Sequence, residues 1–282
     1  MEREATLLVL ALAICGPLCV LFGVMARPLQ RLDASGRHVE RLAWRRLWLP
    51  LAPAGFALLV LIGWAAQEPD ETDDGVATAL MLAAIPGAII GSRAVARAAL
   101  SAARRIKPLA GTVGLVRPRV IIDPLLEDTL DGEALVAVLA HESSHARHRD
   151  PLRILLAQLA TDLQWPASSA TARFHHWLHA LELARDEEAR DDGADGDALA
   201  DAIVTVAKLA RRTPYRFDVC ASLTGHGEML RDRVSRLMNP PLADTRRAGR
   251  RWPLAILTVA LLAIAIGLLG GDRLVRHLPG VF

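Results

Sequence analysis

The chain has 282 residues, enough for one folded domain and several additional helices. Hydrophobic residues make up 52% of it and gather in long runs separated by charged stretches, a pattern typical of a membrane protein. The formal net charge of +2 gives no strongly basic field, so we expect no direct binding of nucleic acid. The three cysteines have no C-x-x-C spacing, so the sequence predicts neither a disulfide framework nor a cysteine zinc cage.

Four apolar runs predict four transmembrane helices. They occupy residues 5–24, 47–66, 76–92 and 252–270, and about 20 apolar residues in a helix are enough to cross the hydrocarbon core of a bilayer. Tryptophans lie at the ends of several of these runs, where an amphipathic ring suits the membrane interface. The sequence therefore predicts a mainly α membrane protein with four transmembrane helices, and membrane lipid is an expected partner.

The placement of charges predicts the orientation of these helices. Arginines fill the connection between the first two runs, whereas the connection at 67–75 carries only acidic charges. Arginines also gather after the third run and directly before the fourth. Because cytoplasmic connections are enriched in Lys and Arg, the segment between these two clusters is predicted to be cytoplasmic, with both termini outside. The predicted organisation is a membrane region at 1–107, a cytoplasmic domain at 108–251, a fourth span at 252–270 and a short extracytoplasmic tail at 271–282.

The domain predicted at 108–251 begins with a strand-like pattern and continues with helical ones. Gly111–Asp123 is rich in β-branched residues and is interrupted by Pro118, which predicts a hairpin or an edge strand. From Asp131 the pattern is helical, with Asp131 as a candidate N-cap and Glu133 near the positive end of the helix dipole. The sequence thus predicts an α+β domain.

The predicted helix contains His-Glu-Ser-Ser-His at residues 141–145, an H-E-x-x-H pattern. His141 and His145 are four residues apart, so both project from one face of a helix, close enough to bind one zinc ion. Glu142 emerges beside them, where a carboxylate can take a proton from the attacking water. The pattern predicts a zinc site with two histidine ligands and Glu142 as general base.

A catalytic zinc site needs a third protein ligand and an open position for water. Glu182 is the first choice, and Asp186, one helical turn further on, can accept a hydrogen bond from a ligand histidine and fix its tautomer. The same Glu-x-x-x-Asp spacing recurs at Glu187 and Glu188, which rank next. His179, three residues before Glu182 on the same face, ranks last.

Three segments occur in the order found in a known family. They are Gly114–Asp150 with the H-E-x-x-H pattern, Glu182–Glu187 with the sequence Glu-Leu-Ala-Arg-Asp-Glu, and Leu230–Val234 with Leu-Arg-Asp-Arg-Val. Together they resemble the integral-membrane zinc peptidases of the β-lactam sensor-transducers, the BlaR/MecR type. One residue departs from the family pattern, because Arg185 stands where a cysteine is common.

The resemblance implies a zinc peptidase domain of the gluzincin type between the third and fourth spans of a multi-pass protein in a bacterial-type cell membrane. It also implies that the strand formed by Arg119, Val120, Ile121 and Ile122 lies along the active-site cleft, where a substrate adds as an extended strand. In the sensor-transducers an extracellular penicillin-binding domain follows the last span. Only residues 271–282 follow that span in this sequence, so we expect the sensor domain to be lacking.

These observations predict a membrane-embedded zinc metalloendopeptidase with one zinc ion and a protein or peptide substrate. The resemblance suggests a cytoplasmic regulatory protein as the substrate, such as a transcriptional repressor cleaved in signal transduction. A second interpretation is a quality-control protease for membrane proteins, which would cleave many substrates. A third is a non-catalytic receptor or scaffold that binds zinc, and the presence of Glu142 argues against it.

Overall fold

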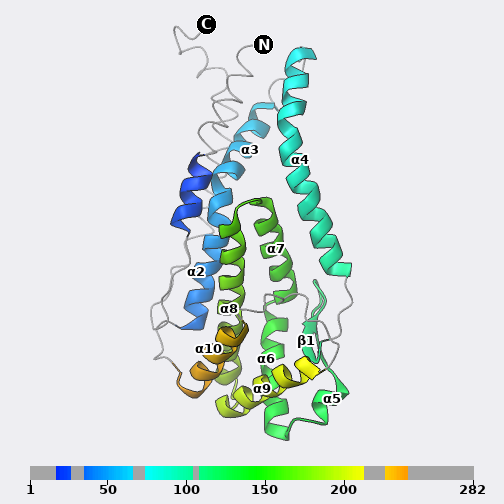
Figure 1. Ribbon diagram of the computed structural model, residues 1–282, viewed down its shortest axis with the longest axis vertical. Helices are drawn as coiled ribbons and strands as arrows, with labels where there is room; N and C mark the ends of the chain where they lie inside the picture. Colours follow the sequence, from blue (N-terminus) through cyan, green and yellow to red (C-terminus); the bar gives the residue numbers. More distant parts are fainter. Residues whose placement is uncertain (1–16, 27–34, 66–73, 104–107, 213–225, 241–282) are drawn as a thin grey trace.

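The computed structural model describes residues 17–26, 35–65, 74–103, 108–212 and 226–240, and it is mostly helical with one small two-stranded sheet (Figure 1). A helix at 17–25 comes first. The elements that follow are α2 (Gly36–Trp48), η1 (Leu49–Leu51), α3 (Ala52–Ala65), α4 (Asp74–Ala103), β1 (Ala110–Val113), β2 (Arg119–Ile122), α5 (Pro124–Glu127), α6 (Gly132–Arg147), α7 (Asp150–Leu163), α8 (Ser168–Asp191), α9 (Gly196–Arg212) and α10 (His226–Met238).

The prediction of a four-span membrane fold is wrong for the chain as described. No helix within the described ranges is long and apolar enough to cross a membrane. The second predicted span, 47–66, is divided among the end of α2, the 3-10 turn η1 around Pro50 and the 14-residue α3. The third, 76–92, is part of α4, whose second half contacts α7 and brings Arg93 and Arg97 to Asp162.

The other two predicted spans fall largely on residues that the structure does not describe. Only the last part of the first span, from residue 17, is described, and the fourth, 252–270, lies entirely outside the described residues. The cytoplasmic location of the domain, the extracytoplasmic termini and the domain boundaries were inferred from the four spans. They stay predictions.

Helices α2 and α8 lie side by side and share a core (Figure 1). At the start of α2, a Cβ on Gly36 would lie 2.7 Å from the backbone carbonyl carbon of Leu183, so only glycine permits this approach. Further along, Leu47 and Trp177 are buried together, and the ring of Trp44 packs 5.1 Å from that of Trp177. Burying each such side chain contributes about 1.5–3 kcal/mol. Helix α2 is therefore attached firmly to α8, although it precedes the domain predicted at 108–251.

Helix α6 contacts the hairpin and helices α8 and α9. The predicted hairpin is confirmed, since β1 and β2 pair antiparallel with Thr112 opposite Val120. The predicted N-cap is also confirmed, because the Asp131 side chain accepts a hydrogen bond from the Ala134 amide. Ala134 and Val138 then pack against α9 and the hairpin. With this face covered, the C-terminal half of α6 turns His141 and His145 toward α8.

Candidate metal centre

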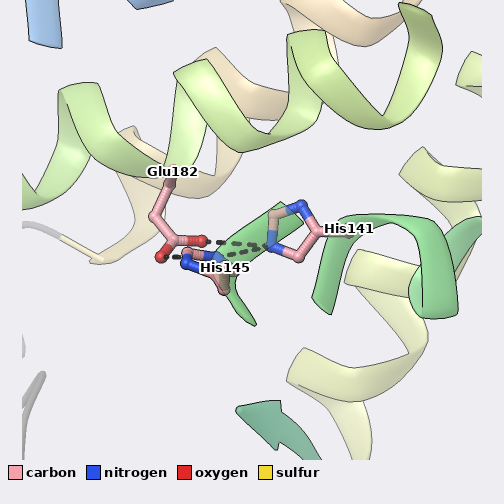
Figure 2. A group of neighbouring side chains, drawn as sticks. All are labelled: His141, His145 and Glu182. Atoms are coloured by element: carbon pink, nitrogen blue, oxygen red, sulfur yellow. Dashed lines mark hydrogen bonds and ion pairs between the residues drawn. The ribbon is translucent and has the colours of Figure 1, made fainter. Parts of the chain in front are cut away.

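Two histidines of α6 and one glutamate of α8 point toward one another (Figure 2). The Nε2 atoms of His141 and His145 lie 3.1 Å apart. Glu182 places one carboxylate oxygen 3.6 Å from His141 Nε2 and the other 3.7 Å from His145 Nε2. Ligand atoms of all three residues lie within 4.8 Å of one another, which makes them a candidate metal site.

Each of the two imidazole rings faces an aspartate with its other nitrogen. His145 Nδ1 is hydrogen-bonded to Asp150 Oδ2 at 2.9 Å, and His141 Nδ1 lies 2.9 Å from Asp186 Oδ1. A ring that donates from Nδ1 to a carboxylate turns the lone pair of Nε2 toward the other ligand atoms. Two such lone pairs 3.1 Å apart, next to a carboxylate, repel one another unless a cation or a proton lies among them.

The donor set fits a zinc ion. Two histidine nitrogens and one carboxylate oxygen form a known ligand set of catalytic zinc, which keeps a fourth position open. Two nitrogens bound tetrahedrally at about 2.0–2.1 Å from one zinc would be separated by about 3.3–3.4 Å, close to the separation of the two Nε2 atoms. The Glu182 side chain is 31% exposed, so this residue lies at the solvent-accessible side of the site.

Charge in the site favours a cation at the meeting point of the three ligand atoms. Burial alone would lower the pKa of His141, but the adjacent carboxylates of Asp186 and Glu182 outweigh burial and raise that pKa to about 10. Carboxylates that stabilise a positive charge this strongly on a buried imidazole also favour a metal ion in contact with the same atoms.

Asp150 reaches His145 through a tight turn between α6 and α7. Arg149 takes the left-handed conformation with φ 53°, and α7 begins at Asp150, with Pro151 in its first turn. Asp150 is buried, and Arg185 donates to both of its carboxylate oxygens, at 2.5 and 3.2 Å. Burial disfavours a charge on Asp150, but His145 and Arg185 outweigh burial and lower its pKa to about 2. Asp150 is therefore held as a carboxylate.

Sequence reasoning gave Asp150 no role, although a signal was present. An Asp-Pro pair shortly after a predicted helix indicates the start of a new helix, which turns the aspartate back toward the preceding one. The structure also gives a reason for the departure at Arg185. Its guanidinium pairs with Asp150 and lies 3.0 Å from Glu188, both charges that a cysteine could not balance.

Arg233 of α10 connects Glu182 and Asp186. Its guanidinium donates two hydrogen bonds to Asp186, both at 2.8 Å, and lies 2.9 Å from Glu182 Oε2. Burial would raise the pKa of Glu182, but Arg233 and the nearby His141 hold that pKa well below its usual range. The sequence pattern identified only the segment Leu230–Val234 and gave Arg233 no role.

Glu142 lies beside the histidines and is contacted from β1. The Thr112 hydroxyl is 2.8 Å from the backbone carbonyl oxygen of Glu142 and 3.0 Å from its carboxylate Oε2, so one donor serves two acceptors. The contact orients the Glu142 carboxylate against the sheet. No motif relates Thr112 to Glu142, because only the packing of β1 on α6 brings them together.

The other three candidates for the third ligand have different partners. Glu187 accepts hydrogen bonds at the N-terminus of α2. Glu188 accepts a hydrogen bond from Ser144, and His179 Nε2 lies 3.1 Å from Asp232 Oδ2. Among the described residues, the group that could hold a metal contains the first-ranked glutamate and none of these three.

The residues predicted to guide a substrate, Arg119 to Ile122, form β2, with Arg119 and Ile121 exposed. The contact with Glu142 comes from the other strand, β1, through Thr112. The Asp123 amide donates to the Leu109 carbonyl, and this register leaves the N–H and C=O of Thr112 pointing away from β2. No third strand pairs with this edge within the described part of the chain.

The three ligand residues, the aspartates beside the histidines and the adjacent glutamate form a site that could hold a metal ion. Residues 110–213 match the family model of Peptidase family M48. Peptidases of this family are metal-dependent and typically use zinc, so the match supports a zinc metallopeptidase family. It does not confirm the narrower resemblance to the β-lactam sensor-transducers. No curated protein and no solved structure matches the chain.

Proposed function

We propose that the chain is a zinc-dependent endopeptidase, with His141, His145 and Glu182 as metal ligands and Glu142 as general base. The observation that carries this proposal is the meeting of three ligand atoms within 4.8 Å. It is supported by the match to a metallopeptidase family over the segment that contains all four residues.

The residues around the site prepare it for peptide hydrolysis. When bound, zinc supplies Lewis acidity, which makes water more acidic and polarises a peptide carbonyl. Asp150 and Asp186 hold the histidine rings with Nε2 toward the metal position, and Arg233 holds the Glu182 carboxylate. Glu142 takes a proton from the attacking water and delivers it to the leaving amine as the C–N bond breaks. Thr112 keeps the Glu142 carboxylate in place for both transfers.

Catalysis is tested by Glu142→Gln, with Glu133→Gln as the matched control because Glu133 is exposed on the same helix. We expect one zinc per chain in wild type and both variants, measured by atomic emission. Cleavage of an unfolded polypeptide such as casein should fall about 10²–10⁴-fold in Glu142→Gln alone. Equal cleavage in Glu142→Gln, or a wild-type chain that binds no zinc, would contradict the proposal.

For the substrate, we propose an extended segment that pairs with the outer edge of β1. The support is the position of Thr112, whose hydroxyl contacts Glu142 while its backbone N–H and C=O face away from β2. A strand added at this edge gains main-chain hydrogen bonds and passes beside the general base. The edge of β2, which the resemblance implies, is the alternative.

Proline substitutions show which of the two edges binds the substrate, because proline removes one outward N–H and is tolerated on an edge strand. Thr112→Pro and Val120→Pro change opposing residues of the same pair. We expect Thr112→Pro to lower kcat/KM more than Thr112→Val, which loses only the hydroxyl, and Val120→Pro to stay near wild type. A larger loss in Val120→Pro would favour the edge of β2.

For the biological role, we propose cleavage of a cytoplasmic regulatory protein, such as a transcriptional repressor, supported by the resemblance of residues 114–150 and 182–187. Protein N-termini in cells of the native host carrying wild type or Glu142→Gln are compared under several envelope stresses. New termini in one or two regulators are expected. Fragments of many membrane proteins would indicate quality control instead, and identical termini would indicate a non-catalytic role.

A further inference from the structure

A continuous chain of buried and partly buried polar contacts leads from the metal site to α2. His145 Nδ1 is hydrogen-bonded to Asp150 Oδ2 at 2.9 Å, and Arg153 Nη1 donates to Asp150 Oδ1 at 3.0 Å. The other terminal nitrogen of Arg153 donates to Glu40 Oε1. Negative and positive groups therefore alternate from α6 through α7 to α2.

Glu40 faces Arg153 inside an aromatic cluster. Glu40 is 6% exposed, and the indole Nε1 of Trp177 donates to its Oε1 at 3.1 Å. The Arg153 guanidinium lies over the rings of Trp44 and Trp177, 5.0 and 5.7 Å from their centroids. A carboxylate in such surroundings is costly unless a cation balances it. Glu40 and Arg153 thus act as one ion pair, in which the carboxylate is buried and the guanidinium is partly exposed.

We propose that Glu40 is a positioning residue for the metal ligand His145, acting through Arg153 and Asp150, and this inference rests on the proposed metal site. Glu40 balances one side of the Arg153 guanidinium, which leaves the other side to hold Asp150 Oδ1. In Glu40→Gln, Arg153 keeps Asp150 as its only charged partner and draws that carboxylate toward itself, against the hold of Arg185 and away from His145 Nδ1. The imidazole then loses the partner that fixes its orientation.

The part of the chain that positions the metal ligands then extends beyond the matched family segment. The match covers residues 110–213, whereas Glu40 belongs to α2, before that segment. Helix α2 is held in register with α8 by the close approach at Gly36 and by Glu187, which accepts hydrogen bonds at its N-terminus. The unit that shapes the metal site therefore includes α2.

Cobalt binding by the full chain tests this inference, since the visible spectrum of bound Co²⁺ depends on ligand geometry. Wild type, Glu40→Gln and Leu47→Ala are loaded with Co²⁺ alone and compared by spectrum and by chelator competition. Leu47 is the matched control, because it is buried in the same α2–α8 core and is no member of the charged chain. We expect Glu40→Gln to bind Co²⁺ about tenfold more weakly with an altered spectrum. Leu47→Ala should lower the melting temperature and keep the wild-type spectrum and affinity.

A wild-type spectrum and affinity in Glu40→Gln, or the same change in Leu47→Ala, would overturn the inference. If Glu40→Gln does not fold, Arg153→Gln is compared with the double variant that also carries Glu40→Gln. Their affinities should be equal, since Glu40 acts through Arg153, and a further loss in the double variant would refute that route. A wild-type chain that binds no Co²⁺ would instead contradict the proposed metal site on which this inference rests.

Discussion

The two histidines of the site are supported in the same chemical way by different parts of the chain. His141 faces Asp186, which is held by Arg233 of α10. His145 faces Asp150, which is held by Arg185 of α8. Asp150 is also held by Arg153, whose other partner is Glu40 of α2. The arginine side chain is 16% exposed in the first support and 3% exposed in the second. The support of His141 thus depends on the docking of α10, whereas the support of His145 is part of the core.

Asp150→Ala should have the largest effect, because it removes the acceptor shared by two arginines and His145. We expect the metal-free chain to lose about 3–5 kcal/mol of unfolding free energy, the usual result when one partner of a buried ion pair is removed. Urea denaturation measures this loss. Asp123→Ala is the control, since the Asp123 side chain caps only the four-residue helix α5. A loss no larger than that of the control would mean that the second support does not belong to the core.

Asp186→Asn should affect metal binding more than stability. The amide keeps the shape of the side chain, and Arg233 retains Glu182 as a partner. We expect zinc affinity to fall about 10–100-fold, as is typical when the partner of a ligand histidine is changed. Chelator competition measures the affinity, and denaturation of the same protein measures stability. A loss of unfolding free energy as large as that of Asp150→Ala would mean that the two supports contribute equally to stability.

Glu187→Ala should have a smaller effect, confined to the attachment of α2. Its carboxylate accepts hydrogen bonds from the Ser35 hydroxyl and from the first amides of α2, as a capping side chain does. Losing a cap costs about 0.5–2 kcal/mol, measured by denaturation. Zinc affinity should stay within about twofold of wild type when α2 remains docked. A loss of zinc binding would show that the cap itself supports the metal site.

Asp191→Ala should have the smallest effect. Asp191 lies one turn beyond Glu187 and pairs with Arg37 of α2 at 2.7 Å, but both side chains are exposed. An exposed pair of this kind contributes about 0–1 kcal/mol. Denaturation should therefore place Asp191→Ala close to wild type. A loss equal to that of Glu187→Ala would mean that general charge attraction, rather than capping, attaches α2.

Local patterns predicted the parts of the site that lie on one helix or within one turn. The i, i+4 spacing puts His141 and His145 on one face, and Asp131 caps their helix as expected. The supporting arginines could not be found in this way, because Arg233 and Arg185 meet their aspartates only when separate helices pack. The hydropathy pattern failed for a related reason. A run of apolar residues does not reveal the 3-10 turn around Pro50 that ends one helix before the next begins.

Three glutamates of α8 are candidates for the third ligand, and their different partners fix the rotation of this helix about its own axis. Glu182 faces the metal position, Glu187 the start of α2 and Glu188 the Ser144 hydroxyl of α6. At about 100° per residue, these side chains leave the helix in directions about 100–140° apart, so rotation of α8 about its own axis breaks contacts on every side. The five-residue interval from Glu182 to Glu187 is therefore a fixed dimension of the protein. One extra residue within it would turn Glu187 by about 100° relative to Glu182, and the metal site and the α2 attachment could no longer form together.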